Sequence, residues 1–292
     1  MIEYETPYGE FVLKRFFSEE NESLQAWDSA DLYVLRYLNE HYRVEGKRVL
    51  VVNDLFGAIT IPMLNAGASC FSVSDSYISR NSYIANCKDN AISRDKHYFI
   101  EETQPFPQNV DVVLMKIPKS LAHLKEQLER IKPVVNSNAL IIAADKTKNI
   151  HTSTIALFEK IVGATKTSLE WKKSRLIMSE NQNLGAETFN GDVDKPHSEQ
   201  LNLVGDRLSR IGFSKDSYEL DRWSLILRSR SSVFSRKKLD QGTDFLLQNM
   251  VVGNGNECII DLACGNGVVG LVAKKLNNNA HLKFVDESYM AV

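Results

Sequence analysis

The sequence predicts an α/β protein in which strands and helices alternate along two successive domains. Three observations support this prediction: apolar runs alternate with helical patterns through residues 1–180, an acid-rich stretch interrupts the pattern, and the alternation restarts after residue 222. Alternating strands and helices form a parallel sheet that helices cover on both faces. At roughly 150 residues per domain, the 292-residue chain has room for two such domains.

The composition is that of an ordinary globular protein. Hydrophobic residues make up 43% of the chain and charged residues 25%, which excludes wholesale disorder. The longest apolar run, Ala139–Ala144, is far shorter than the roughly 20 residues that span a bilayer, so we expect no membrane association. Met1, Ile2 and Glu3 open the chain without the basic start of a signal peptide, and we expect a cytoplasmic protein.

The cysteines and histidines indicate neither a metal site nor a nucleophile triad. No cysteine belongs to a C-x-x-C pair, and the six histidines are dispersed along the chain. Scattered cysteines in a cytoplasmic protein are typically free thiols that pack as small apolar residues. The four cysteines are Cys70, Cys87, Cys258 and Cys264.

The first domain, residues 1–180, is predicted to hold a series of buried parallel strands. Arg48–Val52 is an apolar run typical of a strand that is buried on both faces. Leucines with helical spacing predict a helix over 121–131 that ends before Pro133. A second helix is predicted from His151 to Lys160, with a hydroxyl residue as its cap. The other predicted strands are 70–75, 97–100, 110–117, 139–144, 166–170 and 174–178.

Residues 181–221 are predicted to be an acidic, solvated linker, and residues 222–292 the start of a second domain. The second domain repeats the pattern with helices over 244–249 and 268–276 and strands over 258–260 and 281–286. A parallel sheet needs several strands to bury its central ones, and only two parallel strands are predicted here. We therefore expect a C-terminally truncated domain.

A glycine-rich turn between the two predicted strands of the second domain carries the chemistry. Asp261 ends the first strand, and Gly265 and Gly267 allow a tight turn against which a ligand can lie. Asp286 ends the next strand, 21 residues after Gly265. In a doubly wound sheet that position lies across the crevice, where a carboxylate can accept both hydroxyls of a ribose.

This spacing fits two cofactors. Gly265, Gly267 and Gly270 satisfy G-x-G-x-x-G, the fingerprint of nicotinamide dinucleotide sites. In that fingerprint the strand runs directly into the first glycine, whereas here an acid and three further residues intervene. The arrangement D-x-x-x-G-x-G resembles motif I of class I S-adenosylmethionine (SAM) methyltransferases, although Ala263 stands where that motif more often has glycine. We favour SAM over nicotinamide and over a purely structural turn.

The first domain contains a degraded copy of the same turn. Asn53 replaces the acid, Ile59 replaces the second glycine and enters the space of the cofactor, and Asp75 ends the next strand. Residues 116–119 (Lys-Ile-Pro-Lys) follow the fourth strand, where amino methyltransferases carry Asn-Pro-Pro-aromatic. We interpret this as duplication followed by loss, and two unrelated α/β domains remain the alternative.

A basic segment between residues 222 and 238 is a candidate nucleic-acid contact. It contains six basic residues and no acid, with Trp223 and Phe234 interleaved. Such a segment can follow a phosphate backbone while its aromatic rings stack on bases. The alternative is a core strand formed by the apolar residues around Leu227 with a solvated charged face. The candidate RNA-binding residues are Arg228, Arg230, Arg236 and Lys237.

Two strings in the second domain closely resemble the paired-domain guanine-N2 ribosomal RNA methyltransferases. They are residues 233–243 (Val-Phe-Ser-Arg-Lys-Lys-Leu-Asp-Gln-Gly-Thr) and 261–268 (Asp-Leu-Ala-Cys-Gly-Asn-Gly-Val). Strings in the first domain look like the large-subunit branch of that family. These strings are residues 24–31, 53–58, 74–79, 116–119, 145–148, 151–154 and 169–173.

This resemblance implies methyl transfer from SAM to guanine N2 of 23S rRNA, with a degenerate first domain that helps to bind RNA. SAM binding carries over to Asp261, Ala263, Gly265, Gly267 and Asp286. The family's catalytic Asn-Pro-Pro-Phe is absent from these 292 residues, so no catalytic residue is assigned and an inactive chain is expected. A 16S rRNA methyltransferase and a non-catalytic RNA-binding module remain alternatives, and we expect a monomer.

Overall fold

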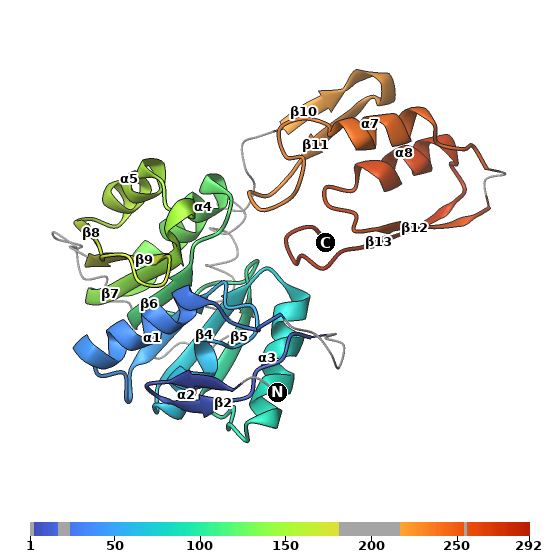
Figure 1. The fold of residues 1–292 in the computed structure, drawn as a ribbon. Coiled ribbons are helices and arrows are strands. Elements are labelled where there is room, and N and C mark those ends of the chain that lie inside the picture. Colours follow the sequence, from blue (N-terminus) through green and yellow to red (C-terminus); the bar gives the residue numbers. More distant parts are fainter. Residues whose placement is uncertain (1–2, 17–23, 181–216, 254–255) are drawn as a thin grey trace, which may run out of the picture. The chain divides into compact units, whose positions relative to one another are not determined.

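The computed structural model describes residues 3–16, 24–180, 217–253 and 256–292 (Figure 1). The chain divides into two compact units, Met1–Asn190 and Gly191–Val292, here called the N-terminal and C-terminal units. No helix among the described residues has the length and apolarity needed to cross a membrane.

The N-terminal unit is built on a sheet with the strand order β5-β4-β3-β6-β7-β9-β8. Strands β5, β4, β3, β6 and β7 are parallel, and β9 and β8 continue the sheet as antiparallel strands. This arrangement confirms the α/β prediction. The strands are β3 Arg48–Val52, β4 Ser69–Ser74, β5 His97–Glu101, β6 Val110–Lys116, β7 Val135–Lys146, β8 Thr165–Thr167 and β9 Ser174–Glu180.

Helices cover both faces of this sheet, because its central strands carry apolar side chains on each side. Val49 and Val51 of β3 belong to one core cluster, and Leu50 and Val52 to the other. The first cluster contains residues of α1, α2 and α3, and the second contains residues of α4 and α5. The helices are α1 Ser29–His41, α2 Thr60–Asn65, α3 Tyr77–Asp89, α4 Leu121–Ile131 and α5 Thr152–Ile161, and two 3-10 turns are η1 Lys132–Val134 and η2 Thr147–Asn149.

Three local features of this unit differ from the sequence predictions. The strand predicted over 166–170 is shorter, since β8 ends at Thr167. The N-cap of α5 is His151, which makes no side-chain capping bond, so the predicted hydroxyl cap is wrong. An additional hairpin, β1 Tyr4–Thr6 and β2 Gly9–Phe11, precedes the sheet. The hairpin is anchored by buried Tyr4, whose hydroxyl donates to the main-chain oxygen of Ala58 at 3.0 Å.

The C-terminal unit combines an antiparallel hairpin with a small parallel sheet. Its core consists of Leu227, Leu247, Val268 and Val272. Strand β10 begins at Ser217, inside the predicted linker, while residues 181–216 lie outside the described residues. Its elements are β10 Ser217–Leu220, η3 Asp221–Trp223, β11 Leu225–Arg228, α7 Gln241–Gln248, β12 Cys258–Leu262, α8 Val268–Leu276 and β13 His281–Val285.

Strands β12 and β13 pair in parallel, and α8 connects them. Asp261 is buried, whereas its neighbours Ile260 and Leu262 are 59% and 76% exposed. Successive side chains of a strand point to opposite faces, so Ile260 and Leu262 share the face opposite Asp261.

Candidate functional site

The glycine-rich turn lies between β12 and α8, where two carboxylates hold it. Asp261 points toward the start of α8, and its Oδ2 accepts a hydrogen bond of 2.8 Å from the main-chain N–H of Gly270. Asp286 follows β13, and its Oδ2 accepts a bond of 2.8 Å from the N–H of Gly265. The turn is thus held to both parallel strands at their carboxyl ends, where ligands of α/β sheets bind.

The two carboxylates differ in exposure. Asp261 is only 7% exposed, and burial together with the nearby charge of Asp286 raises its pKa, although the bond from Gly270 opposes this rise. Asp286 is half-buried, and its Oδ1 accepts from the N–H of Ser288 at 2.9 Å. Each carboxylate oxygen has two lone pairs, so Asp286 retains capacity to accept bonds from a ligand.

The glycines of the turn serve different purposes. Gly265 has a φ of +53°, and a Cβ built there would meet no atom within 4 Å, so space is open beside it. Gly267 has a φ of +75° and is the N-cap of α8, without a side-chain capping bond. Gly270 is needed for packing instead, since a Cβ would run into the ring of Phe284 and the carboxylate of Asp261.

Ala263 and Asn266 complete the turn. Ala263 has a φ of +57°, a left-handed conformation that is costly for a residue with a Cβ. This strain explains why glycine is more frequent at the corresponding place in motif I. Asn266 fixes the turn from the other side, since its Nδ2 donates to the hydroxyl of Tyr218 in β10 at 3.0 Å.

The corresponding place in the N-terminal unit is closed by side chains. The strand order reverses between β3 and β6, which is the point where a doubly wound sheet opens a crevice. Asn53, just after β3, donates from Nδ2 to the main-chain oxygen of Lys116 at the end of β6, at 2.8 Å. Asn53 also exchanges two hydrogen bonds with Gln127 of α4, at 3.0 and 2.9 Å. The amide groups therefore bridge the crevice.

The backbone amides of the first turn are also occupied. Both oxygens of buried Asp54 accept hydrogen bonds of 2.8–3.0 Å from the amides of residues 57–60. The prediction that Ile59 enters the space of the cofactor is wrong. Ile59 is fully buried in the core on the side of α1–α3, since it lies at the start of α2 with a helical backbone.

A buried polar cluster continues from Asn53 and Gln127 toward the end of β5. Glu102, which follows β5, has no exposed surface, and its Oε1 contacts Nε2 of His123 at 2.7 Å and Nε2 of Gln127 at 2.6 Å. Burial lowers the pKa of His123, but the bond to Glu102 and its charge outweigh burial and raise it. Asn53, Gln127, Glu102 and His123 thus form one connected group.

Lys116 ends β6, and its side chain reaches the start of α1. Its Nζ lies 2.7 Å from Asp28 Oδ1 and 2.9 Å from Asp31 Oδ1. Burial opposes the charge of Lys116, but the two carboxylates outweigh burial and raise its pKa. Burial raises the pKa of Asp31 to about 6 despite Lys116, and the charge of Asp28 adds to the rise. Lys116 therefore holds the start of α1 to the sheet.

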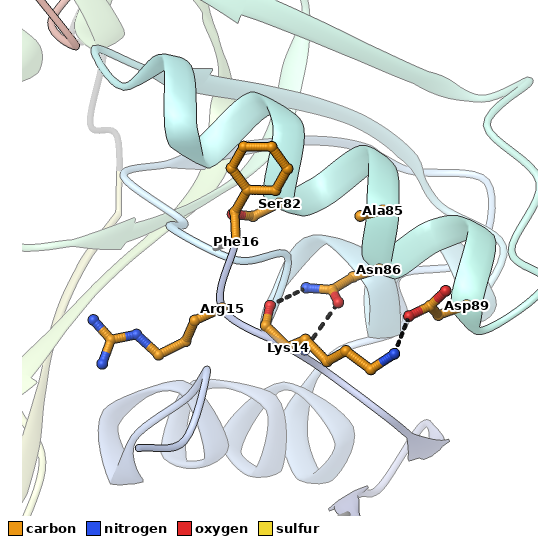
Figure 2. Close-up of a pocket in the computed structure, with 7 residues that line it drawn as sticks. All are labelled: Lys14, Arg15, Phe16, Ser82, Ala85, Asn86 and Asp89. Atoms are coloured by element: carbon orange, nitrogen blue, oxygen red, sulfur yellow. Dashed lines mark hydrogen bonds and ion pairs between the residues drawn. The ribbon is translucent and has the colours of Figure 1, made fainter. Parts of the chain in front are cut away.

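The N-terminal unit also has a pocket of about 180 Å³ between residues 14–16 and α3 (Figure 2). The amide of Asn86 clamps the backbone of Lys14, accepting from its N–H and donating to its oxygen, both at 2.9 Å. Lys14 Nζ reaches Asp89 at 2.7 Å. These contacts hold the N-terminal segment to α3, and we assign no ligand to this pocket.

The basic segment lies mainly in irregular structure. Arg228 ends β11, while Arg230, Arg236 and Lys237 follow in the turns that lead to α7. Arg228 and Lys237 are exposed and the other two are half-buried. The proposed core strand is short, since β11 ends at Arg228. Phe234, within these turns, is 72% exposed.

Two family models match the chain. The RLMG N-terminal domain matches residues 1–183, and the methyltransferase small domain matches residues 224–292. The first match covers more than half of the chain. The chain belongs to the ribosomal RNA large subunit methyltransferase G family. This confirms the resemblance of its motifs to the large-subunit branch.

Relatives and solved structures agree with this family. The methyltransferase G of Pseudoalteromonas translucida is 38% identical over 283 residues, which cover 97% of this chain and 68% of the relative. That of Psychromonas ingrahamii is 36% identical over 285 residues, with 96% and 68% covered. The T. thermophilus 16S rRNA N2 G1207 methyltransferase, solved with AdoMet and guanosine, has a TM-score of 0.65 at 12% identity, over 99% of this chain and 69% of that one. This structural likeness confirms the methyltransferase fold.

Among the described residues, no group of three or more His, Cys, Asp or Glu side chains is arranged to hold a metal ion. The four cysteines are free thiols, as the sequence predicts. Burial raises the pKa of Cys70 and, to about 11, that of Cys87.

Proposed function

We propose that this protein methylates the exocyclic N2 of a guanine in 23S rRNA and uses SAM as the methyl donor. The observation that carries the proposal is the pair of carboxylates, Asp261 and Asp286, which hold the glycine-rich turn at the carboxyl ends of two parallel strands. Membership of the ribosomal RNA large subunit methyltransferase G family supplies the substrate class.

The residues of this turn fit SAM. Space beside Gly265 is open to a ligand. Asp286 is half-buried and can accept bonds from a pair of ribose hydroxyls. When bound, SAM supplies a methyl group activated by a positively charged sulfur. In this proposal Asp261, Ala263, Gly265, Gly267 and Asp286 hold it.

The chain's own part in the reaction is positioning. The lone pair of the guanine amine is delocalised into the ring, so the amine must be held in line with the methyl group and away from water. The base must also be unstacked from the RNA to reach the turn. Asp286 and Asp261 fix the turn, and hence the place of the cofactor, before the base arrives. We assign no catalytic residue within these 292 residues.

The N-terminal unit is proposed to be a degenerate methyltransferase domain that serves as an RNA-binding scaffold. Asn53, Gln127 and Lys116 fill the crevice in which a ligand of such a sheet would lie. The proposed domains are the degenerate methyltransferase domain 1–180, the linker 181–221 and the SAM-binding domain 222–292. The proposed RNA-contacting residues are Arg228, Arg230, Arg236 and Lys237. A monomeric state and a cytoplasmic location are part of the same proposal.

Gene disruption tests the proposed function directly. In 23S rRNA from the disrupted strain, mass spectrometry of nuclease fragments should show one N2-methylguanine replaced by guanine. The wild-type gene should restore the methyl group, and a gene encoding Asp286→Ala should not, whereas Glu219→Gln, an exposed carboxylate of β10, should restore it. Loss of methylguanine from 16S rRNA instead would favour the small-subunit alternative, and an unchanged pattern in both RNAs would reject the proposal.

A further inference from the structure

Beyond the glycine-rich turn, the N-terminal unit carries a hairpin whose two loop residues are lysines in a strained conformation that its fold does not require. Trp171 and Ser174 exchange two main-chain hydrogen bonds of 2.9 Å, which closes a hairpin with Lys172 and Lys173 as its two loop residues. Both lysines have positive φ, 46° and 61°. Two-residue loops with positive φ at both positions strongly prefer Asn-Gly, because side chains with a Cβ are strained there.

The two strained loop residues of this hairpin both carry an exposed positive charge. Lys172 and Lys173 are exposed, and neither has a carboxylate partner among the described residues. The hairpin also brings further charges close, since the N–H of Thr147 donates to the oxygen of Lys173 at 2.9 Å. Thr147 lies between Lys146 and Lys148, which are exposed and equally without a carboxylate partner in the described part of the chain.

An aromatic pair lies beside these lysines. Trp171 packs on Tyr33 of α1 with ring centroids 5.5 Å apart, and the Tyr33 hydroxyl donates to the oxygen of Leu169 at 3.0 Å. Two cations flank the indole, since Lys172 Nζ lies 4.7 Å and the Arg36 guanidinium 5.6 Å from its ring centroid. Figure 1 shows α1 near the β7–β9 side of the sheet, to which this hairpin belongs.

Acids near the hairpin offset only part of its positive charge. Glu40 pairs with Arg36 at 2.8 Å, and Asp145 accepts from the N–H of Lys146 and from Asn149. Glu170 is exposed next to Trp171. Arg36 and the four lysines carry five positive charges against three negative charges on Glu40, Asp145 and Glu170, so a net positive charge of two remains around the half-buried indole.

We propose that this surface, the Trp171 platform, binds single-stranded RNA. The platform comprises Tyr33, Arg36, Lys146, Lys148 and residues 171–173. Proteins that hold single-stranded RNA combine a row of cations along the phosphates with aromatic rings on which bases stack, and the platform supplies both. This inference rests on the proposed function and specifies which surface of the N-terminal unit contacts the rRNA.

The test replaces the strained lysines with the residues that this turn prefers. Lys172→Asn with Lys173→Gly removes both charges and should leave the melting temperature unchanged or raised, because the new residues relieve the strain. Fluorescence anisotropy of the full 292-residue chain with a labelled 20-nucleotide single-stranded RNA should then show about ten- to thirtyfold weaker binding at 0.1 M KCl. The slope of log affinity against log salt should become shallower by about 1.4, since each lost phosphate contact contributes about 0.7.

A matched control and an aromatic variant complete the experiment. Lys88→Gln with Lys96→Gln removes two exposed charges, one in α3 and one just before β5, the strand at the opposite edge of the sheet, and should leave binding within about twofold. Trp171→Ala should weaken binding by about five- to hundredfold with an unchanged salt slope, and Trp171→Phe should retain most of the affinity.

The outcomes separate this inference from the proposed function. If the parent chain binds the RNA and the hairpin variant binds it equally with the same salt slope, the platform is overturned while the proposed function stands. If the hairpin variant loses binding to the intact large ribosomal subunit but not to free RNA, the platform recognises protein and the inference is also overturned. A parent chain that binds neither RNA nor the subunit counts against the proposed function itself.

Discussion

The side-chain amide of Asn53 donates a hydrogen bond of 2.8 Å to the main-chain oxygen of Lys116, across the two strands between which the sheet of the N-terminal unit reverses its order. The bond joins residues 63 positions apart and fills the crevice that a ligand would need. In the C-terminal unit, Asp261 and Asp286 instead hold the corresponding turn by accepting hydrogen bonds from the main-chain N–H groups of Gly270 and Gly265. The space beside Gly265 stays open.

We expect residues 1–180 to fold in isolation without binding SAM. Both core clusters of the N-terminal unit lie within these residues, and Asn53, Gln127 and Asp54 occupy the crevice and its amides. Isothermal titration calorimetry of the isolated unit with SAM should give no heat of binding, while circular dichroism should show a cooperative melt. Saturable binding at a 1:1 ratio would contradict the degenerate site.

Substitutions at the second turn should weaken SAM binding by the 292-residue chain. Asp286→Ala removes the acceptor for Gly265 and for the ribose, and hydrogen bonds to a charged group contribute about 1.5–3 kcal/mol each, so affinity should fall at least tenfold. Gly265→Val adds a β-branched side chain at a φ of +53° and should abolish binding. Calorimetry measures both variants, with Glu219→Gln as the control that should bind as the parent does. Equal affinity in Asp286→Ala would place the cofactor elsewhere.

The stability of the N-terminal unit should depend on pH through Asp31. Its folded pKa of about 6 lies above the unfolded value of 3.8, so between about pH 4 and pH 6 the folded state binds more protons than the unfolded state. The free energy of unfolding therefore falls as pH rises through this range, by about 3 kcal/mol for this group. Urea unfolding at pH 4 and pH 7 should show this fall in the parent and its absence in Asp31→Asn.

Glu40→Gln is the matched control for that experiment. Glu40 is an exposed carboxylate on the same helix as Asp31. Its substitution should leave the difference in the free energy of unfolding between pH 4 and pH 7 as it is in the parent. If the parent and Asp31→Asn show the same change of stability with pH, Lys116 keeps Asp31 ionised throughout, and the prediction is wrong.

Charge reversal in the basic segment should weaken RNA binding. Arg236→Glu with Lys237→Glu places two acids in the turns between β11 and α7, where they repel phosphates. Affinity for a 23S rRNA fragment should fall by at least about tenfold, and the plot of log affinity against log salt should flatten. Lys125→Glu on α4 is the single-reversal control, because that lysine lies in an exposed ion pair with Glu129. An unchanged slope would place the RNA contact on another surface.

Local patterns predicted most of the fold and the candidate cofactor turn. The apolar runs at Arg48–Val52 and Val110–Lys116 became neighbouring central strands, and α8 has the bounds Val268–Leu276 that its helical pattern indicates. Hydrophobic periodicity and glycine positions are local signals, so they can be read without the tertiary structure. The hairpin of β1 and β2 was missed because its strands have three residues each, too few to show a period.

The sequence by itself determined that Asp261 and Asp286 flank a glycine-rich turn, because strand, turn, helix and strand follow one another within about thirty residues and each has its own local pattern. Only the tertiary structure decided why the first turn is closed. The pairs that close it, Asn53 with Lys116 and Gln127 with Glu102, lie 63 and 25 residues apart, and no local pattern links them. It likewise decided that Ile59 belongs to the core, since Ile59 is the N-cap of α2 with a helical backbone, whereas Gly267, the N-cap of α8, has a φ of +75°. Contacts between distant residues depend on which strands become neighbours, and hydrophobic burial of the whole sheet determines that choice.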